Sequence, residues 1–482
     1  MNRRLCRRAI MNVFKMSRKC KKYLLWFAHE HVDFRLAEIE SILDMYDISL
    51  KTIDRPENNP YWIVESISEA AIKKIASRSI SLRSCIELWG NGGNQQDFHK
   101  SVKLYPQENM TPYLNPEKSF KVIVETFCKH FTQDEKIKKI ESFSYLPTEG
   151  PVNLKNPDTT LMYIEYYGLD PNTIPEKPYQ YFFGRLIADG QRQLIRKLSL
   201  KTRTFIGNTS MDPQLSLLMA NQAQVQDGDL ILDPFVGSGS LLVAASQFGG
   251  YALGTDIDYL MLHARTRPSR ISQKTRGKDE SIASNMKQYG TSSYYLDVLV
   301  SDFSLPVWRS DMRVDAIITD PPYGIREATE RVGTAKRQPV IEPHRIATHI
   351  PSKIDYGLPQ IFGDLLTFAA NHLKINGRLV CWFPLFREHY ADDQIPLHPC
   401  LKVIANSEQI LSRYTSRRLL TYKKIRDPQE DDTINDSNIL DFREQYFGQR
   451  DESRKERRMQ RAEKRAKNKE NWEKGIREKT DR

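Results

Sequence analysis

Residues 230–258, LILDPFVGSGSLLVAASQFGGYALGTDID, decide the fold of this chain. A short apolar run at 230–233 ends in an acid, and a turn with two glycines then leads into an apolar, helix-like segment. A second apolar run ends at Asp256. This order of strand, turn, helix and strand predicts a parallel β-sheet with crossover helices.

The alternation of strand and helix continues as far as residue 425. Beyond 230–233 and 251–256, apolar runs predict strands at 294–300, 315–320, 378–383, 401–411 and 417–425. The last two runs are close enough in sequence to form an antiparallel hairpin. We therefore predict an α/β fold for residues 205–425, with a seven-stranded Rossmann-like sheet.

The first part of the chain has a different pattern. Strand-then-helix units at 23–46 and 61–80, and further strands within 119–127 and 150–168, predict an α+β domain over residues 23–175. The stretch 170–179 holds three prolines, which favours a linker. Residues 176–204 then predict a basic linker or helix, which is either a solvated face or a phosphate contact beside the active site. Its cations are Arg185, Arg192, Arg196, Lys197, Lys201 and Arg203.

The charge is concentrated at the two ends of the chain. The formal net charge is +11, but residues 1–22 carry nine Lys or Arg and no acid, and residues 450–482 carry 14 basic and 8 acidic side chains. The body of the chain is therefore slightly acidic, and total charge supports RNA binding only weakly. The basic extension, 1–22, fits either a mitochondrial transit peptide or a disordered arm, and 426–482 predicts a charged tail.

Composition excludes some classes of protein. No apolar run approaches the roughly 18 residues that a membrane-spanning helix needs. The six cysteines show no C-x-x-C spacing, so neither a metal site nor a disulfide framework is indicated. We therefore expect a reducing compartment and a cytoplasmic location.

The glycine turn and the following strand end predict a nucleoside cofactor. Glycines at a strand-to-helix turn let a ligand approach the backbone, and an acid about 20 residues later is placed to bind both ribose hydroxyls. We assign the ribose to Asp256 and expect Asp258 to cap the next helix. Asp302 either accepts a hydrogen bond from an adenine amino group, or is a helix cap or a surface residue. The turn candidates are Asp233, Pro234, Phe235, Gly237, Ser238 and Gly239.

The motif Asp320-Pro321-Pro322-Tyr323-Gly324 follows the predicted strand 315–320. Two prolines fix the backbone and remove two N–H donors, so the loop carbonyls remain free as acceptors. Asp320 adds a carboxylate acceptor, and Tyr323 adds a flat face for stacking. These groups suit a planar base with an amino group, held in line with an electrophilic methyl sulfonium. Such a base must be unstacked or flipped before it can enter.

A loop at 325–353 follows this motif, and its cations include Arg326, Arg331, Lys336, Arg337 and Arg345. We predict that the loop closes over the flipped nucleotide. The alternative is a disordered insertion with no role in binding.

The motifs DPFVGSGS, GTDID and DPPYG, in that order, resemble class I S-adenosylmethionine-dependent amino-methyltransferases. With LLWFAHEHVDFRLAEIESI, GPVNLKNPD and IGNTSMDPQLSLLMAN, most of residues 23–425 resembles the eukaryotic tRNA guanine-10 N2-methyltransferase catalytic subunits. The resemblance implies that S-adenosylmethionine is the cofactor and that Ile257 joins the cofactor-binding residues. It also implies a ferredoxin-like plus THUMP RNA-binding domain, tRNA as substrate, and a heterodimer with a small zinc-binding activator subunit. Ser238 departs from the usual Thr of the family but keeps the hydroxyl.

The identity of the target base, guanine, is implied by the resemblance alone, because a DPPY pocket suits adenine, cytosine or guanine. Two other functions therefore remain open at this point. A DNA adenine-N6 methyltransferase would carry a DNA-reading domain in place of the N-terminal α+β unit. A non-catalytic RNA-binding scaffold has no need for the intact Asp320 and Tyr323.

Overall fold

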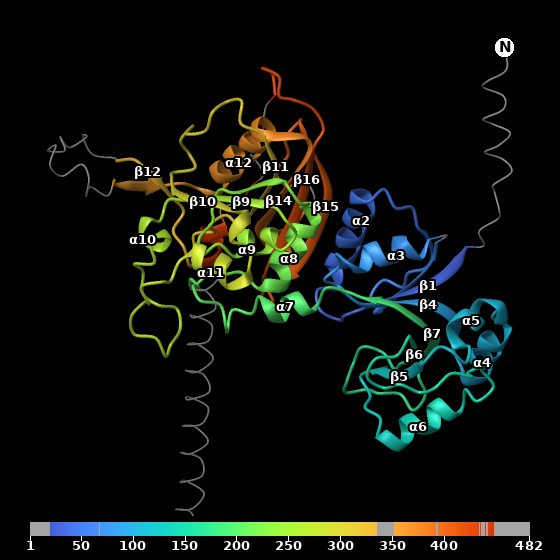
Figure 1. Ribbon diagram of the computed structural model, residues 1–482. Coiled ribbons are helices and arrows are strands. Elements are labelled where there is room, and N and C mark those ends of the chain that lie inside the picture. The colour runs from blue at the N-terminus through green and yellow to red at the C-terminus, as the bar shows by residue number, and fades with distance from the viewer. Residues whose placement is uncertain are drawn as a thin grey trace, which may run out of the picture. The chain divides into compact units, whose positions relative to one another are not determined.

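The computed structural model describes residues 20–66, 68–334, 351–391, 394–432, 434, 439 and 442–447. The chain divides into two compact units (Figure 1). The first comprises residues 1–202 and 212–224, and the second comprises residues 203–211 and 225–482.

The first unit is built on a seven-stranded sheet with the order β2-β3-β1-β4-β7-β6-β5. All its pairings are antiparallel except that of β5 with β6. The strands are β1 (Lys21–Phe27), β2 (Lys51–Asp54), β3 (Tyr61–Ser66), β4 (Leu82–Gly92), β5 (Phe120–Phe127), β6 (Thr159–Tyr166) and β7 (Gln180–Asp189). The helices are η1 (Val32–Phe34), α2 (Arg35–Met45), α3 (Glu69–Ala76), α4 (Gln95–Leu104), α5 (Gln107–Leu114), α6 (Gln133–Glu141), α7 (Gln193–Lys197) and α8 (Pro213–Gln222).

The predicted linker at 176–204 is wrong, because β7 lies between β4 and β6 in this sheet. The stretch 170–179 is a connection within the unit. Arg185, expected in a solvated or phosphate-binding patch, is buried in β7 and forms ion pairs of 2.5 Å with both Glu69 and Glu87. The Glu87 side chain is fully buried, and its charge is compensated by Arg185 together with Lys21, whose Nζ lies 2.6 Å from Glu87 Oε1.

Helix α8 falls in the first unit, although its residues were predicted to belong to the second domain. Asp212 caps the helix by accepting the N–H groups of Gln214 and Leu215. Near its end, the buried Asn221 amide donates to the Glu38 carboxylate of α2 at 2.7 Å and accepts from Arg78 at 3.1 Å. These buried polar contacts tie α8 to the N-terminal fold.

The second unit contains the predicted seven-stranded sheet. Its order is β10-β9-β8-β11-β14-β16-β15, with a separate two-stranded ribbon of β12 and β13. The strands are β8 (Leu230–Asp233), β9 (Tyr251–Asp256), β10 (Tyr295–Val300), β11 (Val314–Thr319), β12 (Glu330–Val332), β13 (Lys353–Asp355), β14 (Leu373–Phe386), β15 (Leu401–Ile410) and β16 (Thr415–Lys424). The helices are α9 (Ser240–Ser246), α10 (Tyr259–Leu262), α11 (Ile282–Tyr289), η2 (Ser292–Tyr294), α12 (Leu358–His372) and η4 (Arg387–His389).

The strand order places the predicted motifs at one edge of the sheet. Strands β10, β9, β8, β11 and β14 pair in parallel, and β16 and β15 close the sheet as the predicted antiparallel hairpin. The order reverses direction between β8 and β11, and such switch points open a crevice at the carboxyl ends of the strands. The glycine turn follows β8 and the DPPY loop follows β11, so both flank this crevice.

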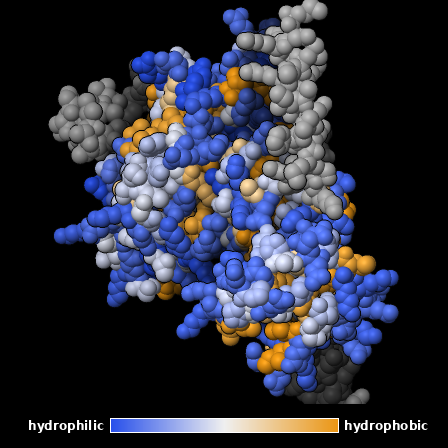
Figure 2. All heavy atoms as spheres, turned by 45° about the vertical axis from the view of Figure 1, so that its right-hand side comes forward, coloured by the Kyte–Doolittle hydropathy of each residue, from blue (hydrophilic) through white to orange (hydrophobic). Residues whose placement is uncertain are grey.

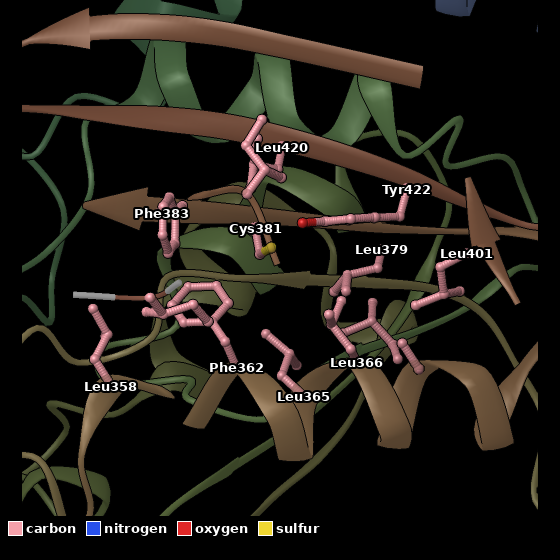
Figure 3. Close-up of a cluster of buried hydrophobic side chains, with 14 of the residues drawn as sticks. Leu358, Phe362, Leu365, Leu366, Leu379, Cys381, Phe383, Leu401, Leu420 and Tyr422 are labelled. Carbon is pink, nitrogen blue, oxygen red and sulfur yellow. The ribbon is translucent and has the colours of Figure 1, made fainter. Parts of the chain in front are cut away.

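Helix α12 supports the sheet through a shared apolar core (Figure 3). Phe362, Leu365 and Leu366 point from the helix toward side chains of β14 and β16. Phe362 meets Phe383 edge-on with ring centroids 5.0 Å apart, and both are buried. Burial of each such side chain contributes roughly 1.5–3 kcal/mol.

The folded unit continues past residue 425, where the charged tail was predicted to begin. Ile439 and Phe442 are buried members of the same core cluster, and residues 442–447 form a short helix. Spaced apolar residues within a polar stretch supply these contacts. The predictions for 1–19 and 450–482 lie outside the described residues, and Lys21 and Lys22 belong to β1 rather than to the extension.

In the described part of the chain, no helix combines the length and apolarity needed to cross a membrane. The face shown in Figure 2 is largely hydrophilic, with small separate apolar areas.

Candidate active site

The glycine turn between β8 and α9 is shaped for close approach. Gly237 and Gly239 have φ values of 49° and 77°, which glycine adopts without strain. A Cβ on Gly239 would meet Ile282 at 2.7 Å, whereas one on Gly237 would meet nothing within 4 Å. Gly239 thus permits packing of the helix start, and Gly237 leaves open space at the turn.

Asp256, at the end of β9, holds the same turn. Its Oδ2 accepts the N–H of Gly237 at 2.8 Å, and its Oδ1 accepts the N–H of Asp258 at 2.9 Å. Asp258 caps α10 by accepting the N–H of Met261 at 3.0 Å, which confirms the predicted cap. Each Asp256 oxygen keeps a further lone pair, so the carboxylate can still accept two hydroxyl groups.

Asp233 supports the turn from inside the fold. Its side chain is buried, and its Oδ1 accepts the Thr319 hydroxyl at 2.7 Å and the Phe235 N–H at 3.1 Å. Burial raises the pKa of Asp233 to about 8 against these stabilising hydrogen bonds. The Ser238 hydroxyl lies 2.5 Å from that of Ser210. The structure therefore uses Asp233 and Ser238 to fix the backbone of the turn.

Asp302 is buried after β10 and binds backbone on both oxygens. It accepts the Ser304 N–H at 2.9 Å and the Val332 N–H at 2.6 Å. Asp302 is therefore neither a helix cap nor a surface residue, and its predicted contact with an adenine amino group stays a prediction.

The DPPY loop begins where β11 ends. The Tyr323 hydroxyl donates to Asp320 Oδ1, and Arg417 Nη1 of β16 donates to Asp320 Oδ2 at 3.1 Å. The Tyr323 ring meets Phe442 edge-on, with centroids 6.4 Å apart. The carboxylate is therefore held on both oxygens.

A cavity of about 380 Å³ brings most of the predicted residues together. Its lining includes Pro234, Phe235, Asp256, Ile257, Asp302, Asp320 and Pro322. Tyr323 lines a second hollow together with Arg443, Glu444 and Phe447. The predicted stacking of Tyr323 on the base therefore stays a prediction.

The cavity concentrates carboxylates. Burial raises the pKa of Asp256 and of Asp320, and Arg417 opposes the shift at Asp320. Partial desolvation also raises the pKa of Glu327, and the charges of Asp256 and Asp320 add to that shift. The site thus favours a ligand that brings positive charge or several hydrogen-bond donors.

Several lining residues were not predicted as site residues. Thr209 donates its hydroxyl to Glu327, and Lys353 of β13 and Tyr356, directly after β13, also line the cavity. Arg417, beside Asp320, was read only as part of a strand. Glu327 stands three residues after the DPPYG motif, which is a signal that could have identified it; Arg417 carries no such local signal.

The described ends of the predicted loop, 325–334 and 351–353, take part in the site. Arg326 lines the cavity. Glu330–Val332 pairs with Lys353–Asp355 as the antiparallel ribbon of β12 and β13. Lys336, Arg337 and Arg345 lie outside the described residues, so closure over a nucleotide stays a prediction.

Comparison with known proteins matches both units. Residues 21–192 match the family model described as Tmrp11 THUMP N-terminal domain, and residues 201–336 match the RMKL-like methyltransferase domain. The chain is 46% identical over 437 residues to the tRNA (guanine(10)-N(2))-methyltransferase TRMT11 of Gallus gallus, covering 89% of this chain and 95% of that protein. This chain belongs to the tRNA (guanine(10)-N(2))-methyltransferase family.

Membership of the tRNA (guanine(10)-N(2))-methyltransferase family extends across distant species. The Homo sapiens TRMT11 protein is 46% identical over 441 residues, covering 88% of this chain and 95% of the relative. The tRNA (guanine(10)-N(2))-methyltransferase of Saccharomyces cerevisiae is 34% identical over 416 residues, covering 83% and 93%. The predicted family and fold class are confirmed, including the THUMP module in the N-terminal unit. Because that unit matches a THUMP domain, the DNA-reading domain that would mark the adenine alternative is not what occupies this part of the chain.

Proposed function

We propose that this chain transfers the methyl group of S-adenosylmethionine to the 2-amino group of guanine 10 in tRNA. The observation that carries the proposal is that Phe235, Asp256 and Asp320 line one cavity. A ribose-binding carboxylate and an amine-binding carboxylate are thereby available in a single site. The substrate and the position follow from the family, whose named members act on guanine 10 of tRNA.

The residues of the cavity fit S-adenosylmethionine. The open space beside Gly237 admits a ligand to the backbone, and the spare lone pairs of Asp256 suit ribose hydroxyls. Phe235 and Phe303 both line the cavity, with ring centroids 4.9 Å apart, and offer apolar surface to the adenine. Ile257 adds to that surface.

The residues of the DPPY loop prepare the amine. The Asp320 carboxylate and the Pro321 carbonyl accept the two N–H groups of the guanine 2-amino group, which favours a pyramidal nitrogen with its lone pair directed outward. When bound, S-adenosylmethionine would supply an electrophilic methyl carbon, whose bond to sulfur would break with the electron pair left on sulfur as the amine nitrogen bonds to that carbon. Asp320 then accepts the proton that the nitrogen loses. Holding the amine in line is the main contribution of these residues to the rate.

The test is methyl transfer from labelled S-adenosylmethionine to unmodified tRNA transcripts, with and without the candidate activator subunit. A transcript with inosine at position 10 lacks only the 2-amino group and should accept no methyl group. Transfer to the inosine transcript at the rate of the guanine transcript would contradict the proposed target.

Asp320 variants test the catalytic assignment in the same assay. Asp320→Ala and Asp320→Asn should lower kcat by about 10²-fold or more while tRNA affinity is retained. Asp311→Asn is a matched control, because Asp311 is exposed and pairs only locally with Arg309. If the Asp320 variants lost tRNA affinity and kept kcat, the result would favour the non-catalytic RNA-binding scaffold.

We also propose that a small zinc-binding activator subunit forms a heterodimer with this chain. Its docking site is inferred to be β10, which ends the sheet order and so presents one unpaired edge. Leu296, Leu299 and Val300 of this strand are more than two-fifths exposed. Such an apolar edge is typical of a protein interface.

Co-purification with the activator subunit tests this surface. Leu299→Lys should weaken association, whereas Leu104→Lys, at an exposed leucine of the first unit, should not. Equal association of both variants would place the interface elsewhere.

A further inference from the structure

Arg417 reaches the DPPY loop from a different part of the sheet. On β16 it lies opposite Pro384 of β14 on one side and Gln409 of β15 on the other. Its guanidinium lies over the Trp382 ring, 4.0 Å from the centroid. An arginine on the closing hairpin is therefore directed toward the end of β11.

The guanidinium is fixed by more than one partner. Its Nε donates to Gln409 Oε1 at 2.8 Å, and its Nη1 donates to Asp320 Oδ2 at 3.1 Å and lies 3.5 Å from the Tyr323 hydroxyl. The side chain is only 14% exposed. The Trp382 ring and the Gln409 side-chain amide already orient the planar guanidinium of Arg417. Its hydrogen bond to Asp320 therefore has a fixed direction.

We propose that Arg417 is a positioning residue for the methyl transfer, which holds the Asp320 carboxylate ionised and turned toward the amine of the substrate. This inference rests on the proposed function. Asp320 lines the cavity, and beside the bonds from Tyr323 and Arg417 each of its oxygens keeps a further lone pair for the amine. Arg417 itself does not need to touch the base or the cofactor.

The charges around Asp320 explain why a cation is needed there. In addition to burial, the charge of Asp320 raises the pKa of three neighbours: Asp233 at the end of β8, Glu327, and Cys381 of β14. Burial raises the pKa of the Asp320 carboxyl, whereas Arg417 lowers it, followed by the Tyr323 hydroxyl. A protonated Asp320 would lose acceptor capacity and could not take up the amine proton.

The experiment measures kcat against pH for Arg417→Gln, Arg417→Lys and the wild-type chain, with tRNA and labelled S-adenosylmethionine. Arg417→Gln should lower kcat by about 10²-fold near neutral pH, and its acid limb should move up by about one pH unit or more. KM for the cofactor should change little. Arg417→Lys keeps the charge but loses the planar fork, so it should restore the acid limb and only part of kcat.

Arg418→Gln is the matched control. Arg418 is the next residue of β16 and faces the other side of the sheet, where it lies over Tyr390 and donates to Asn406. This variant should keep both the rate and the acid limb.

Three results would overturn the inference. One is an Arg417→Gln variant with kcat within about twofold of wild type and the same acid limb. The second is a loss of rate with no change in the pH profile and no rescue by lysine, which is what a structural role would give. The third is the absence of methyl transfer by the wild-type chain even with the activator subunit. That result would contradict the proposed function and this inference together, whereas in the first two results the wild-type chain is active.

Discussion

The Thr319 hydroxyl, at the end of β11, donates a hydrogen bond of 2.7 Å to the Asp233 carboxyl at the end of β8. This contact joins the two strands that flank the switch point, immediately before the glycine turn and the DPPY loop. The two halves of the site are therefore connected through buried polar side chains as well as through the sheet.

Asp233 should make stability depend on pH. Its pKa is raised to about 8 in the folded chain against an ordinary value of 3.8, so between these values the folded state binds more protons than the unfolded state. Stability from this group therefore falls as pH rises from about 4 to about 8, by about 1.4 kcal/mol for each unit of pKa difference. Asp233→Asn, which mimics the neutral acid, should gain stability relative to wild type as pH rises through this range.

Denaturant unfolding at pH 5 and pH 8 checks this prediction. Asp311→Asn, at an exposed acid, serves as the reference and should track the wild type. A difference between Asp233→Asn and wild type that is the same at both pH values would mean that Asp233 is ionised in the folded chain.

We expect Arg185 to stabilise the folded first unit and not to bind nucleic acid. Removing Arg185 leaves the buried Glu87 carboxylate with Lys21 as its remaining ion-pair partner, so we expect part of the cost of about 3–5 kcal/mol that breaking a buried ion pair carries. Arg185→Gln should therefore lower the free energy of unfolding of the first unit. Arg196→Gln, at an exposed arginine of α7, should unfold like the wild type. If Arg185→Gln were fully stable and only bound tRNA less well, the phosphate-contact reading would be restored.

The segment after residue 425 should be needed for the second unit. Phe442 is buried in the core cluster, and loss of a buried phenylalanine costs roughly 3–5 kcal/mol. A chain ending at residue 425 should show a lower midpoint of thermal unfolding, whereas a chain ending at residue 449 should not. Phe442→Ala in the full chain separates this contact from the rest of the segment, and unchanged unfolding in that variant would argue against it.

The loop after the DPPY motif should serve catalysis more than cofactor binding. Replacing residues 335–350 by a short glycine-serine connection leaves the β12 and β13 ribbon in place. We expect methyl transfer to tRNA to fall by about tenfold or more, because the replacement removes Lys336, Arg337 and Arg345, three of the cations predicted to meet the nucleotide. S-adenosylhomocysteine affinity, measured by calorimetry, should stay near that of the wild type. Full-rate transfer by the shortened chain would rule out a closing role.

Much of the second unit could be predicted because its signals are local. The runs at 230–233 and 251–256 coincide with β8 and β9, since a buried parallel strand is a short apolar run bounded by turn residues. In the first unit β4 and β7 were not predicted. Arg185 of β7 appears in the sequence as part of a basic patch, and only strand pairing gives it an acidic neighbour.

The sequence alone determined which chemical groups stand at the ends of β8, β9 and β11, because each motif sits on one strand and one turn. Only the tertiary structure decided that Arg417 serves Asp320, 97 residues away along the chain, and that Phe442 backs Tyr323. Strand order and side-chain packing set those neighbours, and neither is encoded in any single segment.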